Sequence, residues 1–302
     1  MAGCAAEAGP EEGGWDAPGF ETVTGALSVA PMACAEPSVG PARGLWLWSP
    51  TPMLTSTERA KFFDFAKARG VRTVYVAAGN YMTYKTEYIN AFTKEAADDC
   101  IQVEILFGKA SWALTAGHAE PVALLKAAIA TIKLMEVKPV GVHFDVEPHL
   151  LSGWSTNMGS YANQYLDLLN KLRPIANAAG LRLTVDIPFW YDGKMVTRNG
   201  VSRPLSELTQ DRTDRVALMD YRDTASAIYT EAAKEVAYAK SKGKDVVIGV
   251  ETMCNVSPSY ITFCQEGKTA IDTAFRTVKD KFAGSSGLGG FAVHHYGTYS
   301  AL

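Results

Sequence analysis

Ionisable and apolar residues alternate in the segment from Gly141 to Pro148. His143, Asp145 and Glu147 stand at every second position, and valine or phenylalanine fills the positions between them. Side chains two apart on a β-strand share a face, so these three are expected to point the same way. Two neighbouring carboxyl groups at the end of a strand suit general acid and base chemistry. The segment therefore predicts a carboxylate-based reaction centre.

Short strand-like segments alternate with amphipathic helical stretches from residue 43 onward, which is typical of βα units around a parallel sheet. The expected strands are 44–48, 71–77, 102–107, 141–145, 182–187, 215–220, 245–250 and 290–294. The expected helices, each with apolar residues at three- and four-residue spacing, are 56–69, 121–135, 160–179, 225–242 and 267–282. Eight such strands predict an α/β fold, a single (β/α)8 TIM barrel over residues 43–302.

The two ends of the chain do not follow this pattern. Residues 1–42 are rich in Ala, Gly, Pro and Glu and lack periodicity, so an irregular N-terminal tail or cover is expected. The chain ends about eight residues after the last expected strand, which leaves no room for a full last helix. The tail is therefore predicted to cover the gap in the ring of helices.

Carboxylates and aromatic residues gather where the expected strands end. This ring consists of Trp46, Trp48, Tyr75, Glu104, Asp145, Glu147, Asp186, Asp220, Tyr221, Glu251, His294, His295 and Tyr296. Aromatic faces stack on sugar rings, and carboxylates bind hydroxyl groups or supply the acid, base or nucleophile of glycosidic cleavage. A carbohydrate substrate is therefore expected. The predicted substrate-binding residues are Trp48, Asp186, Trp190, Asp220, His294 and Tyr296.

The Asp145-x-Glu147 pattern resembles the chitinase-type, family 18 glycoside hydrolases, whose fourth strand carries Asp-x-x-Asp-x-Asp-x-Glu. Met219-Asp220-Tyr221, on the sixth expected strand, is similar to that family's Met-x-Tyr. The resemblance implies that Glu147 protonates the leaving oxygen and that Asp145 orients the substrate's acetamido group, the internal nucleophile. It also implies that Tyr221 donates a hydrogen bond in the transition state.

The chain departs from this family pattern at three positions. Val140 and His143 stand where the motif has aspartates, and His294 stands near the place of the family's eighth-strand tryptophan. The main alternative is therefore a carbohydrate-binding barrel that has lost catalysis. Binding without release of reducing ends would distinguish it from an enzyme.

A second resemblance starts from Glu147-Pro148-His149, which is similar to the Asn-Glu-Pro of retaining glycosidases built on the same barrel. Val146 stands in place of the asparagine. Those enzymes place a nucleophilic glutamate on strand seven, which implies that Glu251 is the nucleophile, Glu147 the acid/base and Tyr221 a partner of the nucleophile. Glu147 is the acid under both resemblances.

Other residues are expected to support the site. His143 lies deep on an apolar strand and is expected to be a neutral histidine beside a carboxylate. Trp46 is expected in the core, whereas Trp48 could form a sugar platform. Three further tryptophans on the loops after strands three, four and five have two interpretations, as ligand contacts or as loop anchors. They are Trp112, Trp154 and Trp190.

Several function classes have no support in the sequence. The net charge of -3 and the lack of a basic cluster argue against nucleic acid, and no apolar run of 18 residues predicts a membrane span. Nucleotide-binding and serine-esterase motifs are absent, and no cofactor is expected. A metal-dependent hydrolase remains a third interpretation, although the first strand, Leu45-Trp46-Leu47-Trp48, lacks the His-x-His of barrel metallohydrolases.

The cysteines bear on localisation. The segment Met1-Ala2-Gly3-Cys4-Ala5 resembles the end of a bacterial lipoprotein signal, in which Cys4 would carry the lipid anchor; the alternative is chance in an Ala/Gly-rich tail. Cys254 and Cys264 bracket a Pro-containing loop, which a disulfide would rigidify in an oxidising compartment, the alternative being two free thiols. A secreted or cell-envelope protein is expected.

Overall fold

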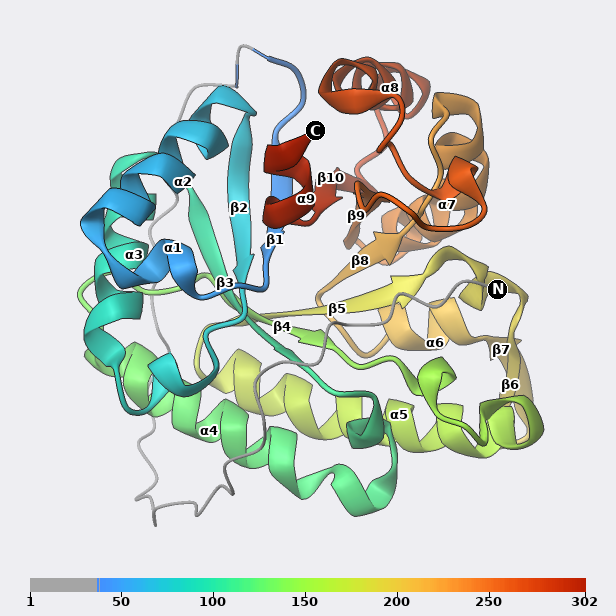
Figure 1. The fold of residues 1–302 in the computed structure, drawn as a ribbon. Helices are drawn as coiled ribbons and strands as arrows, with labels where there is room; N and C mark the ends of the chain where they lie inside the picture. The colour runs from blue at the N-terminus through green and yellow to red at the C-terminus, as the bar shows by residue number, and fades with distance from the viewer. Residues whose placement is uncertain (1–36, 38) are drawn as a thin grey trace.

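The computed structural model describes residue 37 and residues 39–302. Within these residues, eight parallel strands close into a barrel in the order β1-β10-β9-β8-β5-β4-β3-β2 (Figure 1). They are β1 (Arg43–Leu47), β2 (Val71–Val76), β3 (Gln102–Gly108), β4 (Gly141–Asp145), β5 (Arg182–Pro188), β8 (Arg215–Met219), β9 (Asp245–Glu251) and β10 (Leu288–His294). The predicted TIM barrel is confirmed, and the strand bounds differ from the expected ones by at most two residues.

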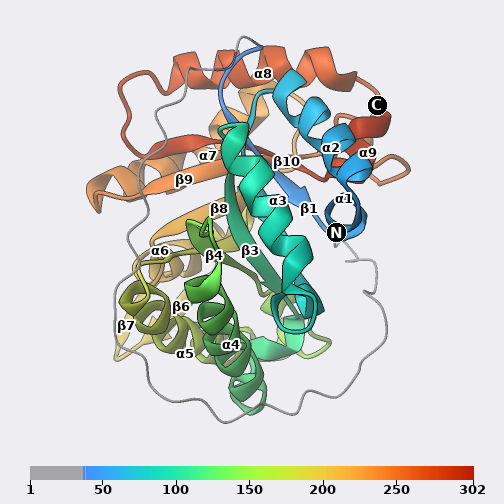
Figure 2. The same cartoon turned by 90° about the vertical axis from the view of Figure 1, so that its left-hand side faces the viewer.

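Helices surround the barrel, and Figure 2 shows α2, α3 and α4 outside the strands. The longer helices are α2 (Ser56–Ala68), α3 (Thr86–Asp98), α4 (Ala119–Leu134), α5 (Trp154–Ala178), α7 (Ala225–Ser241) and α8 (Gly267–Lys281). The shorter ones are α1 (Thr51–Leu54), α6 (Leu205–Gln210) and α9 (Tyr296–Ala301), with 3-10 turns η1 (Gly79–Met82), η2 (Ala110–Ala113), η3 (Thr115–Gly117), η4 (Pro148–Leu150), η5 (Phe189–Gly193) and η6 (Ser259–Ile261). All five expected helices are present, and α3 is an additional one.

The connection from β5 to β8 contains a hairpin where a full helix would be usual. After η5, strands β6 (Met195–Arg198) and β7 (Val201–Pro204) pair antiparallel, and the six-residue helix α6 follows. Asn199 and Gly200 have φ values of +52° and +78°, as a two-residue type I′ turn requires. The Asn-Gly pair therefore explains why the chain reverses here.

The short helix α9 occupies the place where the sequence left no room for a full last helix. Its Tyr296 ring packs against Phe62 of α2, with ring centroids 4.8 Å apart. The Tyr299 hydroxyl accepts hydrogen bonds from Arg43 at 3.0 Å and Arg69 at 3.1 Å. The expected cover by residues 1–42 falls mostly outside the described residues, so it and the boundary at residue 42 stay predictions.

Aromatic side chains fill the barrel interior below its mouth. Trp46 and Tyr75 lie there with four smaller apolar residues, Leu106, Ala217, Val247 and Ala292. Glycines make room for both rings, since a Cβ on Gly249 would lie 2.9 Å from Trp46 and one on Gly44 would lie 2.7 Å from the Tyr75 hydroxyl. These side chains pack beside the buried ionisable residues of the interior, and the ring centroids of Tyr75 and His143 are 4.3 Å apart.

Candidate active site

The alternation along β4 matches the expectation from the sequence. Val142, Phe144 and Val146 pack into the core between strands and helices, so the residues between them face the barrel interior. His143 is fully buried, and Glu147 is 8% exposed. Successive ionisable residues of one strand thus rise from the interior to the mouth.

Glu147 lies where the loops after β4 and β5 meet. Its Oε2 atom is 3.2 Å from Nε2 of His149, a residue of η4. Nδ1 of His149 is 3.1 Å from the hydroxyl of Tyr191 in η5, and the rings of His149 and Trp190 are 5.0 Å apart. His149 and Tyr191 were not predicted as site residues, although His149 follows Glu147 closely enough to be suspected.

Asp145 interacts with Glu147 through charge. The residue is partly exposed, but its Oδ1 atom is buried and has no hydrogen-bond partner among the described residues. Burial raises the pKa of Asp145 well above its usual range, and the negative charges of Glu147 and Asp186 act in the same direction. Asp145 therefore holds a proton at higher pH than an isolated aspartate would.

A buried ionic cluster lies beneath this pair. Nε2 of His143 is 2.8 Å from Oδ2 of Asp186, and its Nδ1 is 3.5 Å from Oε2 of Glu104. Arg182 donates to the other Glu104 oxygen at 2.9 Å. Burial alone would lower the pKa of His143, but the two carboxylates outweigh it and raise the pKa to about 9. The expectation of a neutral His143 is therefore wrong, because two carboxylates flank the ring and hold it as a cation.

Asp186 belongs to this cluster and lies below the mouth. It was predicted to bind substrate, but it is 2% exposed, and its Oδ2 atom also accepts from Trp46 Nε1 at 3.4 Å. Its Oδ1 atom is buried without a hydrogen-bond partner in the described part of the chain. Asp186 therefore contacts His143 and Trp46 in the interior of the barrel.

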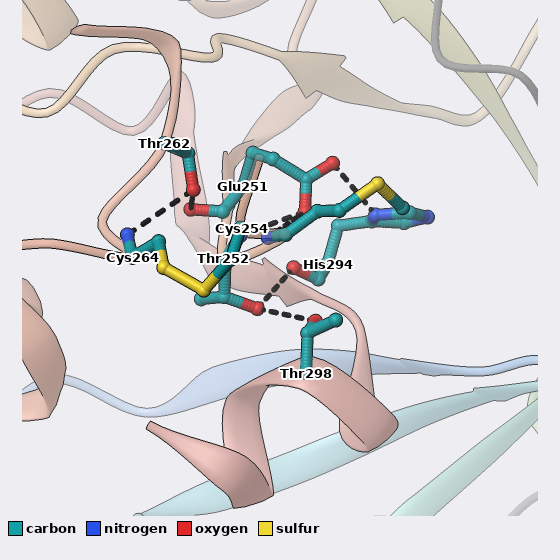
Figure 3. Close-up of a disulfide and its surroundings, with 8 residues drawn as sticks. Glu251, Thr252, Cys254, Thr262, Cys264, His294 and Thr298 are labelled. Carbon is teal, nitrogen blue, oxygen red and sulfur yellow. Dashed lines mark hydrogen bonds and ion pairs between the residues drawn. A yellow bond between two sulfur atoms is a disulfide. The ribbon is translucent and has the colours of Figure 1, made fainter. Parts of the chain in front are cut away.

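Glu251, the last residue of β9, is held as an anion by several hydrogen-bond donors (Figure 3). The backbone amides of Thr252 and Met253 donate to its Oε1 atom at 2.7 and 2.8 Å. Trp48 Nε1 donates to Nε2 of His294 at 2.9 Å, so the ring proton lies on Nδ1, 3.0 Å from Glu251 Oε2. Burial raises the pKa of Glu251, but these donors outweigh it and the net pKa is lowered.

The loop after β9 is closed by a disulfide between Cys254 and Cys264 (Figure 3). This settles the alternative that the sequence left open between a disulfide and two thiols. The backbone amide of Phe263 donates to the Glu251 carbonyl at 2.9 Å, so the end of the loop is anchored on the strand where the loop begins. The disulfide therefore braces the segment whose amides hold Glu251.

Replacing both cysteines of this loop by serine is expected to lower the free energy of unfolding by about 2–3 kcal/mol, because the cross-link closes a ten-residue separation in the unfolded chain. Urea unfolding of the wild type and of Cys254→Ser/Cys264→Ser, both without a reducing agent, measures this difference. Ser257→Ala, in the same loop, is the matched control. An unchanged unfolding midpoint would show that the disulfide contributes nothing to stability.

Two predicted substrate-binding residues lie away from the mouth. Asp220 is fully buried, burial raises its pKa well above the usual range, and the charges of Glu231 and Glu235 on α7 raise it further. It follows Leu218 in the strand alternation and faces the helix layer. Tyr296 packs against Phe62, also in the helix layer. The structure thus does not bring these two residues together with Glu147.

Of the remaining predicted residues, some lie at the mouth of the barrel and others anchor its loops. The Tyr221 and His294 rings are 6.1 Å apart, and Trp48 is half-buried beside His294. Of the loop tryptophans, Trp112 is buried as an anchor, and Trp154 stacks on Tyr191 with ring centroids 6.2 Å apart. Trp190, half-buried beside His149, is the loop tryptophan that lies nearest to the Glu147 contacts.

The described residues hold no group of three or more His, Cys, Asp or Glu side chains that could bind a metal ion. His143 pairs with Asp186 and His294 with Glu251, in two separate contacts. In the same part of the chain, no helix combines the length and the apolar composition of a membrane span.

Comparison with solved structures bears on the fold. The chain is similar to a GH18 chitinase from Pseudoalteromonas aurantia, at 15% identity and a TM-score of 0.56 over 84% of this chain and 94% of that one. The two proteins share the TIM-barrel fold. A structure of fungal β-1,4-galactanases matches at 14% identity and a TM-score of 0.54, over 84% of this chain and 88% of that one. A putative α-L-fucosidase from Bacteroides thetaiotaomicron matches at 9% identity and a TM-score of 0.52, over 91% of each chain. No protein-family model and no curated protein matches the chain. The expected resemblance to barrel glycoside hydrolases is thus confirmed for the fold.

Proposed function

We propose that this protein is a glycoside hydrolase that cleaves a polysaccharide or oligosaccharide, with Glu147 as the general acid. The observation that carries the proposal is the Asp145–Glu147 pair at the carboxyl end of β4. The structural likeness to a chitinase, a galactanase and a fucosidase supports this class of reaction on this fold. Proton donation to the leaving oxygen is the step that a positioned carboxylic acid accelerates.

Asp145 assists Glu147 in this proposal. Its pKa is raised because its carboxyl group is largely removed from water and lies next to two negative groups, so it retains a proton where a fully exposed aspartate would not. A protonated Asp145 lets Glu147 lose and regain its own proton without creating two adjacent negative charges. Tyr221, Trp48 and Trp190 border the same mouth and are proposed to contact the sugar.

Glu251 serves as a fixed anion that orients His294 rather than as a nucleophile. It is 1% exposed, and its carboxylate already accepts from two backbone amides and from His294. A nucleophile must reach the anomeric carbon, whereas these contacts hold the carboxylate inside the barrel wall. His294 in turn is fixed by Trp48, so the assembly positions two side chains of the mouth.

Glu251→Gln is therefore expected to lower kcat/KM by about 10- to 100-fold, the value of one charge-assisted hydrogen bond. Loss of a covalent nucleophile would cost far more, on the order of 10⁶-fold. Steady-state kinetics of this variant, with exposed Glu266→Gln at the end of the same loop as a control, distinguish the two roles. Restoration of the rate by azide in Glu251→Ala would assign Glu251 as the nucleophile and contradict the proposed role.

The direct test of the proposed function is a screen of the wild-type protein against insoluble and soluble glycans, including chitin, β-1,4-galactan, xylan and fucosylated oligosaccharides. Reducing-end release is measured beside pull-down binding on the same glycans. Release from at least one glycan is the expected result. Binding to a glycan without any release would replace the proposal by the non-catalytic carbohydrate-binding barrel, and release that stops after metal chelation would favour the metal-dependent alternative.

We further propose a secreted or cell-envelope location. The Cys254–Cys264 disulfide supports an oxidising compartment, where such bonds persist. Cys4, proposed to carry a lipid anchor, lies outside the described residues. Mass spectrometry of the N-terminal peptide from the native host tests the anchor, and an unmodified Cys4 would contradict it.

A further inference from the structure

Glu147, His149 and Tyr191 form a chain of polar contacts across two loops. The Glu147 carboxyl is 3.2 Å from Nε2 of His149, and Nδ1 of the same ring is 3.1 Å from the Tyr191 hydroxyl. The side chains of Glu147 and His149 are only 9% and 12% exposed, and Tyr191 is buried. Water therefore competes little with either contact, and the chain itself must satisfy these groups.

An imidazole between a carboxyl and a phenol can satisfy the carboxyl in two protonation states. When Glu147 is ionised, Nε2–H of His149 donates to it and the Tyr191 hydroxyl donates to Nδ1. When Glu147 is protonated, it donates to Nε2, the ring proton lies on Nδ1, and the Tyr191 oxygen accepts. One proton is taken up, at Glu147, and the ring proton moves between nitrogens by exchange with solvent.

The Tyr191 phenol is suited to this exchange of roles. Burial raises the pKa of Tyr191 well above its usual range, so its hydroxyl keeps its proton in both arrangements. The charge of Glu147 also acts on Asp145 of β4 and Tyr165 of α5 and raises the pKa of both. Beside the ring of His149 lies Trp190, whose own ring is faced by the Lys194 ammonium at 5.3 Å.

We propose that His149, held by Tyr191, is the positioning residue that keeps the Glu147 carboxyl hydrogen-bonded and oriented in both of its protonation states. Its importance for turnover rests on the proposed function, because a general acid that is also reprotonated passes through both states in each cycle. The hydrogen-bonding chain itself does not depend on that function. It can therefore be tested separately.

The kinetic test uses variants that keep or remove a side chain able both to donate a hydrogen bond to Glu147 and to accept one from it. His149→Leu is expected to lower kcat by about 10- to 100-fold, because it removes a bond to a charged group. His149→Gln restores most of the rate, since its amide can present N–H or C=O to Glu147. Tyr191→Phe lowers kcat by about 3- to 10-fold, the value of one neutral hydrogen bond, and Tyr229→Phe on α7 is the control. Equal losses in His149→Leu and His149→Gln would overturn the proposal.

The pH profile separates positioning from a merely structural role. In Tyr191→Phe, a ring proton on Nδ1 would be an orphaned buried donor, which is costlier than an orphaned acceptor. The ring proton therefore stays on Nε2, where it donates to ionised Glu147 and favours that state. Because the general acid must be protonated, the alkaline limb of the pH–rate profile is expected to move to lower pH. A profile identical to that of the wild type overturns the proposal.

Nitrogen-15 NMR of His149 tests the chain without any substrate. On acidification, the ring proton of the wild type is expected to move from Nε2 to Nδ1, whereas in Tyr191→Phe it remains on Nε2. A wild-type ring that takes a second proton while Glu147 stays ionised would overturn the proposal. If the glycan screen detects no hydrolysis but NMR shows the exchange, the proposed function fails while the hydrogen-bonding chain stands.

Discussion

Glu147→Gln is expected to lower the rate of glycan hydrolysis by about 10²- to 10⁴-fold, the usual contribution of a general acid, and to leave glycan binding within a few-fold. Glutamine has the shape of glutamate and can keep the contact with His149 Nε2, but it cannot give a proton to the leaving oxygen. The substitution therefore removes the chemistry and preserves the site. Reducing-end release and isothermal titration with the same oligosaccharide measure the two effects.

The dependence on the leaving group makes this test specific for proton donation. An aryl glycoside whose phenol leaves as an anion needs little protonation, so Glu147→Gln should retain much more of the wild-type rate on it than on the natural linkage. Glu136→Gln is the matched control, because this exposed glutamate pairs with Lys94 far from the site. A Glu147→Gln variant that keeps the wild-type rate on both substrates would remove Glu147 from the mechanism.

The barrel could be predicted because its signals are local. Each strand is a short β-branched run, and the period-two pattern of β4 depends on neighbours in the chain only. Helix α3 could have been found in the same way, since Ile89, Phe92 and Ala96 form its buried face at helical spacing. The β6–β7 hairpin also has a local signal, the Asn199-Gly200 turn, which was not used.

Strand alternation also explains where the structure places some of the predicted site residues. Along β8, Val216 and Leu218 pack in the outer core, so Asp220 shares their parity and faces the helices, whereas Tyr221 has the parity of the mouth. Extending the count past the end of the strand would have predicted from the sequence alone that Asp220 faces the helices. Tyr296 begins a helix that packs on α2, and such packing depends on tertiary structure.

The contacts of the site could not be predicted because they join distant segments. Tyr191 lies 42 residues from His149 in the chain, and only the closed barrel brings the two loops together. The charge of His143 has the same origin, since Glu104 comes from β3 and Asp186 from β5, one strand on each side of β4. A sequence pattern predicts where a side chain points, whereas its protonation depends on these neighbours.

The charge of His143 predicts a loss of stability at alkaline pH. Its pKa is about 9 in the folded protein and about 6.5 for an unperturbed histidine, so folding favours the protonated ring. The resulting stabilisation is fully present below pH 6.5 and is lost as the pH rises through 9. At 1.36 kcal/mol per unit, the free energy of unfolding is expected to fall by about 3 kcal/mol across this window.

Urea unfolding at intervals from pH 6.5 to 9.5 measures this loss, and His143→Gln removes the titrating group. The variant is expected to be less stable, because it leaves Asp186 buried without its cation and Glu104 with Arg182 alone. The slope of stability with pH is therefore the informative quantity. Burial raises the pKa of Glu235 to about 7, so this carboxyl changes the free energy of unfolding mostly before the window begins. It is present in both proteins. A flatter dependence in His143→Gln than in the wild type is therefore the expected result. Equal slopes would mean that the ring is already neutral at pH 7, and that the ionic cluster beneath Asp145 carries one positive charge fewer than its geometry indicates.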